Sequence, residues 1–418
     1  MKCEMTQQNQ ETKHLYDRRK FLTCSVLATA SLSTSPLHTF LGGPWRTEAS
    51  NTPQKIIVIG AGLAGLSAAY ELTQAGHDVH VIEARTRAGG RVMTLREPFP
   101  SGLYAEAGAT RIHASHEQTL KYVRLFNLKL VPFYPGTEHY IWRYRGKREE
   151  VRWKKFADQV LKSVGVGLGQ AKDWFRIDGG NDLLPQAFAQ KLADKIIYDA
   201  PVMKIEQDSS SVRVWFSRHG TTESLAADRL ICALPATILK TLEIAPRFSP
   251  PKQFVLQQLE YTSASRVFLQ CRMRFWQPQK LTGYAITDQP AEIWDSTFVQ
   301  PGTAGILQHY TRGDVSQRIT LLPESERINA TLAEMERVFP GTREHFERGV
   351  SKCWSEDPWV RGAWAHPNPD QLRQLMQPER RIHFAGEHIS TNSSWMHGAF
   401  ESATRVVQEV NQTSRQAT

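Results

Sequence analysis

The chain has 418 residues, of which 40% are hydrophobic, and a formal net charge of +9. This length can bury a large core, which we expect to be divided between two interleaved domains. The positive surplus is modest and contains no dense run of Lys and Arg, so nothing here favours nucleic-acid binding, and no apolar run is long enough for a transmembrane helix.

The first fifty residues (1–50) are typical of an export leader and spacer. Residues 17–22 contain the pair Arg18-Arg19 and resemble a twin-arginine motif, and a short segment rich in Ser, Thr and Ala follows at 26–32. Because that route carries folded proteins, it suits a protein that acquires a cofactor before export. We therefore expect a periplasmic or extracellular location, with a chance Arg-Arg pair in a tail as the alternative.

The segment from Lys55 to Arg91 has the order of a dinucleotide-binding βαβ unit. Gly60 permits a tight turn, Gly62 lets backbone approach a pyrophosphate, and Gly65 lets the helix pack closely on the strand. The phosphates are then expected at the helix N-terminus, where free N–H groups favour anions. The parts in order are an apolar run at 56–59, the glycine turn at 60–65, a helical pattern, a second apolar run at 79–82, and Glu83, which is placed to accept hydrogen bonds from a ribose.

The residues after Glu83 distinguish FAD from NAD. Ala84 and Arg85 come first, and Gly90 and Arg91 then suit a loop that wraps the pyrophosphate from the other side. From here the chain resembles the flavin-containing amine oxidase family, which includes monoamine, polyamine and L-amino acid oxidases. The resemblance covers nearly everything after residue 53.

The resemblance implies an α/β fold, in which an FAD-binding, Rossmann-like doubly wound domain is interleaved with an α+β substrate domain. The FAD-binding domain is expected at 53–100, 178–245 and 352–412, and the substrate domain at 101–177 and 246–351. Between the motifs we expect helices at 119–126 and 153–164, and strands at 196–198, 202–205, 212–216 and 229–235. By resemblance, further cofactor contacts are expected from Gly108, Ala109, Thr110, Val202, Gly386 and Glu387.

A helix is expected to begin at Trp395-Met396. In the family, the N-terminus of this helix points at the flavin pyrimidine ring, where free N–H groups stabilise the negative charge left by an arriving hydride. Met396 would supply one such backbone donor. The alternative is an amphipathic C-terminal helix whose Trp and Met belong to the core.

Trp395 and Trp364 match the two walls of the aromatic cage of amine oxidases. Aromatic faces on both sides of an amine would orient it and attract its cationic form. Either tryptophan could instead be ordinary core packing. Monoamine oxidases carry a flavin-bonded cysteine where this chain has Ala363, so we expect FAD to be bound non-covalently.

Arg111 decides the expected substrate class. It lies in a segment that resembles the G-x-x-R pattern of L-amino acid oxidases, whose arginine holds the substrate carboxylate with two parallel N–H donors. The alternative is a structural arginine paired with a nearby acid such as Glu106.

Arg266 departs from the family, which usually has a lysine holding a water near flavin N5. Arginine keeps the charge but cannot act as a base. This substitution puts rapid reaction with oxygen in question and favours a dehydrogenase as one alternative.

The sequence gives little indication of which substrate side chain is preferred. Acids at Glu292 and Asp295, around Trp294, would favour basic substrates unless they are merely exposed. His113 and His116 lie just beyond Arg111 and could touch substrate. The cysteines outside the leader, Cys232, Cys271 and Cys353, imply neither a disulfide framework nor a metal site.

These observations predict FAD-dependent oxidation of L-amino acids by hydride transfer from Cα to flavin N5, giving a 2-oxo acid, ammonia and, from oxygen, hydrogen peroxide. Arg111, Trp364, Trp395 and Arg266 are the expected catalytic residues. The alternatives are a monoamine or polyamine oxidase, a dehydrogenase with another electron acceptor, and a flavin-binding protein without turnover. A homodimer is left open.

Overall fold

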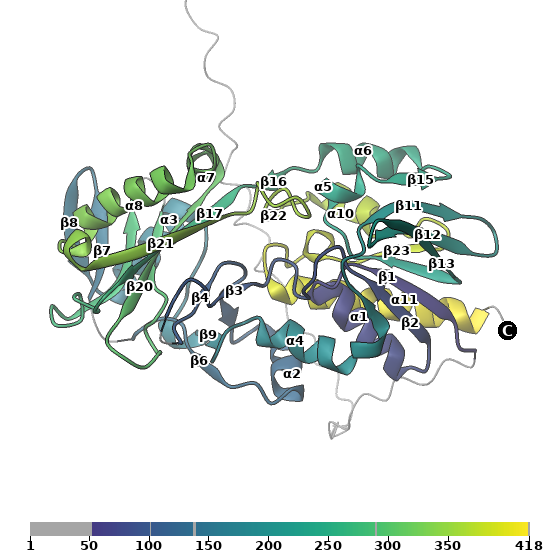
Figure 1. Ribbon diagram of the computed structural model, residues 1–418, viewed down its shortest axis with the longest axis horizontal. Helices are drawn as coiled ribbons and strands as arrows, with labels where there is room; N and C mark the ends of the chain where they lie inside the picture. Colours follow the sequence, from purple (N-terminus) through teal and green to yellow (C-terminus); the bar gives the residue numbers. More distant parts are fainter. Residues whose placement is uncertain (1–51, 101, 137–138, 289–290, 417–418) are drawn as a thin grey trace, which may run out of the picture. The chain divides into compact units, whose positions relative to one another are not determined.

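A computed structural model describes residues 52–416 apart from 101, 137–138 and 289–290 (Figure 1). The expected leader and spacer at 1–50 lie outside the described residues. The described part is a mixed α/β structure with a parallel sheet and a large mixed sheet. Within it, no helix combines the length and apolar character that crossing a bilayer requires.

The first sheet is parallel and has five strands. Its strands are nearly continuous apolar runs, as expected where both faces of a parallel sheet are covered. One face packs on α1 (Leu63–Gln74) and α11 (Met396–Gln416), which also contact each other. From edge to edge the strands are β10 (Ile196–Ile197), β2 (Asp78–Ile82), β1 (Lys55–Ile59), β14 (Arg229–Cys232) and β23 (Ile382–Phe384).

The opposite face of the parallel sheet is covered by a second core cluster. That cluster includes side chains of a four-stranded sheet with the order β13-β12-β11-β15. Its strands are β11 (Val202–Gln207), β12 (Val212–Arg218), β13 (Thr221–Ala227) and β15 (Glu243–Ala245). The strands expected at 196–198, 202–205, 212–216 and 229–235 are thus all present.

The second large sheet has seven strands in the order β21-β17-β20-β19-β18-β7-β8. Helix α8 (Glu324–Val338) packs on one face, against β17 and β21 (Figure 1), and α3 (Trp153–Val164) packs against β7 and β18. The strands are β7 (His139–Tyr144), β8 (Lys147–Val151), β17 (Ala264–Cys271), β18 (Leu281–Thr287), β19 (Glu292–Asp295), β20 (Gly305–Arg312) and β21 (Phe346–Cys353).

Short elements connect the two large sheets. A three-stranded sheet contains β5 (Ile112–His113), β9 (Trp174–Ile177) and β6 (Leu130–Pro132), and helix α2 (Glu117–Leu125) follows β5. This small sheet places Arg111, the residue just before β5, beside Trp174 of β9. The helices expected at 119–126 and 153–164 correspond to α2 and α3.

The position of helix α6 (Pro250–Gln258) does not agree with the expected division into domains. It falls within 246–351, the range expected for the substrate domain, yet Val255 and Leu256 are buried in the core cluster of the parallel sheet. It packs there against α10 (Pro369–Met376). The other domain limits stay predictions.

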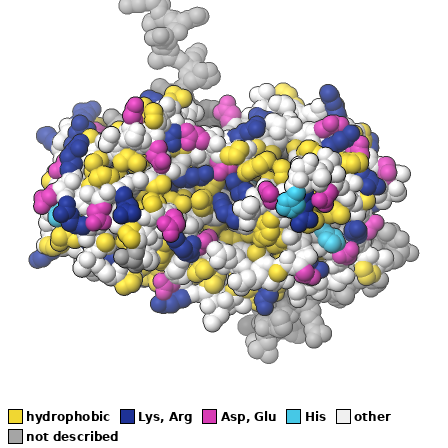
Figure 2. Space-filling model, in the orientation of Figure 1, with side chains coloured by type: hydrophobic (Ala, Val, Ile, Leu, Met, Phe, Trp, Pro, Cys, Tyr) yellow, Lys and Arg dark blue, Asp and Glu magenta, His cyan; other side chains and the backbone are white. Residues whose placement is uncertain are grey.

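On the face drawn in Figure 2, Lys and Arg side chains are interspersed with Asp and Glu. The net positive charge is therefore not gathered into one patch on this face.

Candidate functional site

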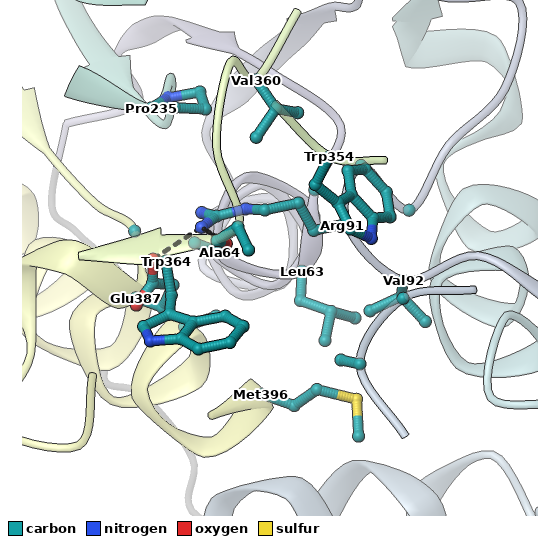
Figure 3. A pocket seen from close by; sticks show the side chains of 18 of the residues that line it. Leu63, Ala64, Arg91, Val92, Pro235, Trp354, Val360, Trp364, Glu387 and Met396 are labelled. Atoms are coloured by element: carbon teal, nitrogen blue, oxygen red, sulfur yellow. Dashed lines mark hydrogen bonds and ion pairs between the residues drawn. The ribbon is translucent and has the colours of Figure 1, made fainter. Parts of the chain in front are cut away.

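A cavity of about 700 Å³ is lined by residues at the N-terminus of α1, at the N-terminus of α11 and on the seven-stranded sheet. Figure 3 shows part of this lining, including Leu63 and Met396 from the two helix starts. The expected site residues line the cavity, with Gly65 as the exception. They are Gly60, Gly62, Glu83, Ala84, Arg85, Gly90, Arg91, Gly108, Ala109, Thr110, Arg111, Val202, Arg266, Trp364, Gly386, Glu387, Trp395 and Met396.

The three glycines of the first turn meet three different steric constraints. Gly60 has φ +100°, in the region that favours glycine, and a Cβ there would lie 3.2 Å from the Ala233 carbonyl oxygen. A Cβ on Gly65 would lie 1.9 Å from the Gly60 carbonyl oxygen, so no side chain fits. At Gly62, by contrast, a Cβ would meet no atom within 4 Å. The open space beside Gly62 belongs to the cavity.

Glu83 closes this turn from the end of β2. One carboxylate oxygen accepts the Ala61 N–H at 2.7 Å and the other accepts the Arg85 N–H at 2.9 Å. Burial raises the pKa of Glu83, and the two backbone hydrogen bonds oppose that rise. The carboxylate is held rigidly at the wall where a ribose is expected.

Arg91 and Glu387 join two distant segments across the cavity wall (Figure 3). The Arg91 Nη1 donates to Glu387 Oε1 at 2.6 Å and to the Ala363 carbonyl oxygen at 2.7 Å. The other Glu387 oxygen accepts the Ser394 N–H at 2.8 Å, just before α11 begins. This pairing fixes the start of α11 relative to the loop that carries Arg91.

The residues at this end of the cavity fit FAD. Helix α1 has neither an acidic residue in its first turn nor a capping side chain, so its free N–H groups suit a phosphate. The first turn of α11 is also without an acid. The three described cysteines are buried and none of them lines the cavity, which suits non-covalent binding.

The seven-stranded sheet brings charged side chains to the other end of the cavity. Tyr310 of β20 is paired in register with Arg266 of β17 on one side and with Glu292 of β19 on the other. Side chains in one cross-strand row share a face, and those two residues further along a strand share it too. Arg312 and Trp294 therefore lie on the same face. All of these except Glu292 line the cavity.

Glu292 is completely buried and is bonded to two arginines. Its Oε2 lies 3.2 Å from the Arg111 Nη1, and its Oε1 accepts from the Arg312 Nη2. Burial raises the pKa of Glu292, but the two arginines outweigh burial and hold it below its ordinary value. Glu292 is thus an ionised acid behind the cavity wall, and it is already paired.

Arg111 is surrounded by aromatic rings. Its Cζ lies 5.2 Å from the ring centre of Trp294, 5.7 Å from that of Trp174 and 5.8 Å from that of Trp395. Its Nη1 also donates to the Tyr134 hydroxyl at 2.9 Å. Burial opposes its charge, but Tyr134 and Glu292 raise the pKa of Arg111 above its ordinary value. Arg111 therefore keeps its charge at the cavity wall.

The suggested pairing of Arg111 with Glu106 is wrong. The Glu106 carboxylate accepts instead from the Thr94 hydroxyl at 3.0 Å and from the Asn181 N–H at 2.8 Å, and burial raises its pKa to about 7. The acid that contacts Arg111 is Glu292, which strand pairing brings from 181 positions away in the sequence.

Arg266 lies in the same cluster and contacts the predicted cofactor segment. Its Nη1 donates to the Glu106 carbonyl oxygen at 2.6 Å and to the Thr110 hydroxyl at 2.5 Å. Its Cζ lies 4.4 Å from the ring centre of Tyr310. Burial lowers the pKa of Arg266, though an arginine stays charged at neutral pH.

Trp364 and Trp395 both line the cavity and are both only partly buried. Trp395 lies against Trp174, with ring centres 5.5 Å apart, and against His116 at 5.2 Å. The Trp364 Nε1 donates to His366 Nε2 at 2.9 Å. Each ring packs on a core cluster and also presents surface to the cavity.

The two histidines beyond Arg111 do not line the cavity. His116 stacks on His397 with ring centres 5.3 Å apart and contacts Trp395, while His113 contacts Trp174. Burial lowers the pKa of His116 to about 4, so the ring is neutral near pH 7. Both histidines thus contact the tryptophans around Arg111.

Glu292 and Asp295, the acids suggested to favour basic substrates, are both buried and already have partners. Asp295 is buried, accepting from the Trp276 Nε1 at 3.1 Å and the Thr297 N–H at 2.8 Å, and it does not line the cavity. Glu292 is occupied by arginines. Neither acid is exposed, and neither is free to attract a cation.

Sequence reasoning missed several residues at this end of the cavity. No motif marks them, because their neighbours come from strands far apart in the chain. A usable signal was the alternation of Tyr310 and Arg312 on β20, which puts both on one face, but the register with Glu292 cannot be read from a single sequence. The residues missed are Tyr134, Trp174, Tyr310 and Arg312.

Comparisons with known proteins agree with this geometry. The family model for flavin containing amine oxidoreductase matches residues 63–164 and 163–411. The putative L-amino-acid oxidase YobN of Bacillus subtilis (strain 168) is 30% identical, over 87% of this chain and 96% of that protein. An L-amino-acid oxidase of Demansia vestigiata is 25% identical, over 88% of each chain.

Solved structures share the fold. Cyclohexylamine oxidase from Brevibacterium oxydans IH-35A superposes with a TM-score of 0.76 at 18% identity, covering 87% of this chain and 99% of that one. Wild-type putrescine oxidase bound to putrescine superposes with a TM-score of 0.74 at 19% identity, covering 86% of this chain and 99% of that one.

Proposed function

The chain belongs to the flavin-containing amine oxidoreductase family, and on that premise we propose that it oxidises L-amino acids to 2-oxo acids, releasing ammonia and hydrogen peroxide. The observation that carries this proposal is the charged Arg111 at the cavity wall, enclosed by three tryptophans. Among the described residues, its acid partner is Glu292, which also pairs with Arg312. Two arginines therefore face one carboxylate, and the remaining positive charge is free to bind a substrate carboxylate.

Bound FAD would supply the hydride acceptor, opposite the substrate Cα–H. The residues of the chain bind and orient the substrate. Arg111 holds the carboxylate, and Trp395 and Trp364 flank the amine. The surrounding tryptophans exclude water, which strengthens the ionic contact.

The relatives support this substrate class, since the Demansia vestigiata protein is an L-amino-acid oxidase and YobN is named a putative L-amino-acid oxidase. The quoted structural neighbours are oxidases of amines without a carboxylate. Amine oxidation is therefore the alternative, and in it Arg111 would serve only to pair with Glu292.

Anaerobic bleaching of the flavin distinguishes the two. We expect L-amino acids to bleach it and their decarboxylated amines to react far more slowly. Arg111→Gln should lower kcat/KM for amino acids by about 10²- to 10⁴-fold while leaving the slow amine reaction within severalfold, because an amine has no carboxylate for the guanidinium to hold and Glu292 keeps its pairing with Arg312. Arg318→Gln, an exposed substitution with the same charge change, is the control. Faster reaction with amines, unaffected by Arg111→Gln, would refute the proposal.

Arg266 supports one further alternative, a dehydrogenase with an acceptor other than oxygen. Its Nη1 already donates to Glu106 and Thr110, at the position where relatives usually have a lysine. Admitting air to bleached enzyme tests this. Recolouring within seconds with formation of peroxide supports an oxidase, whereas recolouring only with an artificial acceptor supports the dehydrogenase.

We also propose that FAD is bound non-covalently. Ala363 stands at the position of the flavin-bonded cysteine, and its carbonyl oxygen accepts from Arg91. Acid precipitation should leave the yellow colour in the supernatant. Colour that stays with the pellet would contradict this proposal.

We propose export by the twin-arginine route, on the basis of residues 17–22. Arg18→Lys combined with Arg19→Lys should retain the enzyme in the cytoplasm. Unchanged export of the double variant would exclude that route. Homodimerisation stays a prediction.

A further inference from the structure

The substrate end of the cavity carries more positive charge than its own acids neutralise. Three arginines line it, namely Arg111, Arg266 and Arg312, and the ionised acid Glu292 pairs with two of them, Arg111 and Arg312. Three positive charges thus face one negative charge. Buried charge is costly unless it is paired, so an imbalance of this kind points to a ligand that brings negative charge.

The other nearby acid does not correct this imbalance. Glu106 lies behind Thr110, with its carboxylate bonded to Thr94 and Asn181, and burial raises its pKa to about 7. The arginines expected at the cofactor end do not share the surplus, because Arg91 is paired with Glu387 and Arg85 with Asp357. Asp357 also pairs with Lys352, which does not line the cavity. Among the arginines that line the cavity, the unbalanced charge is therefore that of Arg111, Arg266 and Arg312.

Of the three arginines, Arg312 is the one with a buried guanidinium nitrogen that has no hydrogen-bond partner in the described structure. Its Nη2 donates to Glu292, but its Nη1 is buried and has no hydrogen-bond partner among the described residues. Its Cζ lies 4.3 Å from the ring centre of Tyr310, and the Arg266 Cζ lies 4.4 Å from the same ring centre. A buried guanidinium N–H left unbonded is unfavourable, and the Arg312 side chain itself lines the cavity, where an anion can contact the guanidinium.

One substrate carboxylate cannot satisfy this arrangement. A bound amino acid with a neutral side chain brings one carboxylate and one ammonium, so it adds no net charge. A basic side chain would add a positive charge to the surplus. An acidic side chain is the one change that reduces it.

From these contacts we infer that the site prefers L-amino acids whose side chain carries a second anionic group, with Arg111 holding the α-carboxylate and Arg312 the side-chain anion. This rests on the proposed function, because it assumes that Arg111 takes the α-carboxylate. Arg312 is then a specificity-determining residue contributed by β20 and paired with Arg111 through Glu292.

Near-isosteric substrates test the preference. L-Glutamate and L-glutamine differ little in size but differ by one charge, as do L-aspartate and L-asparagine. We expect kcat/KM to be about 10- to 100-fold higher for the acid of at least one pair, the range expected for a charged hydrogen bond. L-Lysine should be the poorest of the panel. Equal or better reaction with the amides would overturn the inference while leaving the proposed function intact.

Substitution of Arg312 tests its role. Arg312→Gln should lower the glutamate-to-glutamine ratio of kcat/KM by at least about tenfold, and Arg312→Lys, which keeps the charge, should retain most of it. Arg318→Gln is the matched control, since it removes an exposed charge from the adjoining helix α7 (Gly313–Thr320) and should leave the ratio unchanged. An unchanged ratio in Arg312→Gln would exclude Arg312 as the selecting residue.

Equilibrium binding gives a readout that does not depend on turnover. Glutarate, with two carboxylates, should bind the holoenzyme at least about tenfold more tightly than pentanoate, measured by the shift of the flavin spectrum. Arg312→Gln should abolish this difference even if the variant turns over slowly. If no L-amino acid bleaches the flavin but glutarate still binds preferentially, the proposed function fails and the anion site stands. If amino acids react and glutarate has no advantage, the inference fails alone.

Discussion

The two ends of the cavity are built in different ways. At the cofactor end the binding groups are mainly backbone, from the glycine turn and the start of α1, together with one-to-one ion pairs such as Arg91–Glu387. At the substrate end they are long side chains. Arg266 and Arg312 come from one face of the seven-stranded sheet, and Arg111 and Arg312 share the ionised Glu292. The first end is a preformed cradle, and the second is a charged surface that requires a ligand to balance it.

Because the two ends of the cavity are built differently, they tolerate different substitutions. A backbone cradle fails when a side chain fills it, whereas a side-chain surface fails when a charge or ring is removed. Substitutions at the first end should therefore alter folding and flavin content, and those at the second should alter substrate choice.

Gly65→Ala should have the largest effect. The new Cβ would lie 1.9 Å from the Gly60 carbonyl oxygen and 3.2 Å from Val58 Cγ1, so the helix must move away from β1. We expect a loss of at least about 3 kcal/mol in the free energy of unfolding, together with loss of flavin. Urea denaturation and the absorbance ratio of flavin to protein measure both.

Gly62→Ala is the matched control on the same turn. Its Cβ would meet no atom within 4 Å, so the protein should fold with near-normal stability while binding FAD more weakly, because the methyl group occupies space expected for the pyrophosphate. Normal flavin content in Gly62→Ala would show that the open space beside this glycine is not the phosphate site.

Glu106 and Glu292 should give opposite dependences of stability on pH. Burial raises the pKa of Glu106 to about 7 in the folded protein, from 4.5, so the unfolded chain releases this proton first and stability falls as pH rises from about 4.5 to 7, by about 3 kcal/mol in total. The pKa of Glu292 is held below its ordinary value, so its contribution is present above that value and is lost as pH falls.

Glu106→Gln should therefore remove the decline between pH 4.5 and 7 and be more stable than the parent above pH 7. Urea unfolding at a series of pH values measures this. An unaltered decline would show that Glu106 is ionised in the fold, and an ionised Glu106 would reduce the charge surplus assigned to the arginines.

The cofactor end could be predicted from the sequence because its groups are local. The glycine turn, Glu83 and Arg91 lie within 37 residues, Lys55 to Arg91, and their spacing alone carries the geometry. Trp364, Glu387 and Trp395 were also located, but through the family resemblance. All of them line the cavity except Gly65, whose place behind the turn follows from close packing.

The substrate end could be predicted only in part. Arg111 was identified by its resemblance to a family motif. The alternative reading named Glu106, five positions away, as its acid partner, and that partner lies instead at Glu292 on a strand of the seven-stranded sheet. Arg312 was not identified at all. Cross-strand register decides both, and register depends on long-range packing that a single sequence does not display.

The smallest predicted effect distinguishes the two tryptophan walls. Trp395 lies 5.8 Å from the Arg111 guanidinium and 5.5 Å from Trp174, so its substitution disturbs the carboxylate-binding arginine as well as the amine. Trp364 instead donates to His366 and makes no ring contact with Arg111 within the described structure. A single cation–π contact contributes about 0.5–1 kcal/mol at a partly exposed site.

Trp395→Phe should therefore lower kcat/KM for L-amino acids about fivefold and for the matching amines about twofold, because only amino acids depend on Arg111. Trp364→Phe should lower both by about twofold, since that ring acts on the amine alone. Steady-state kinetics with leucine and its decarboxylated amine measure these effects, as the ratio of kcat/KM in each variant to that in the parent enzyme for each substrate. If Trp364→Phe discriminated between the two substrates more strongly than Trp395→Phe, the carboxylate would lie on the Trp364 side, and the separation of the cavity into a cofactor end and an arginine-lined substrate end would have to be redrawn.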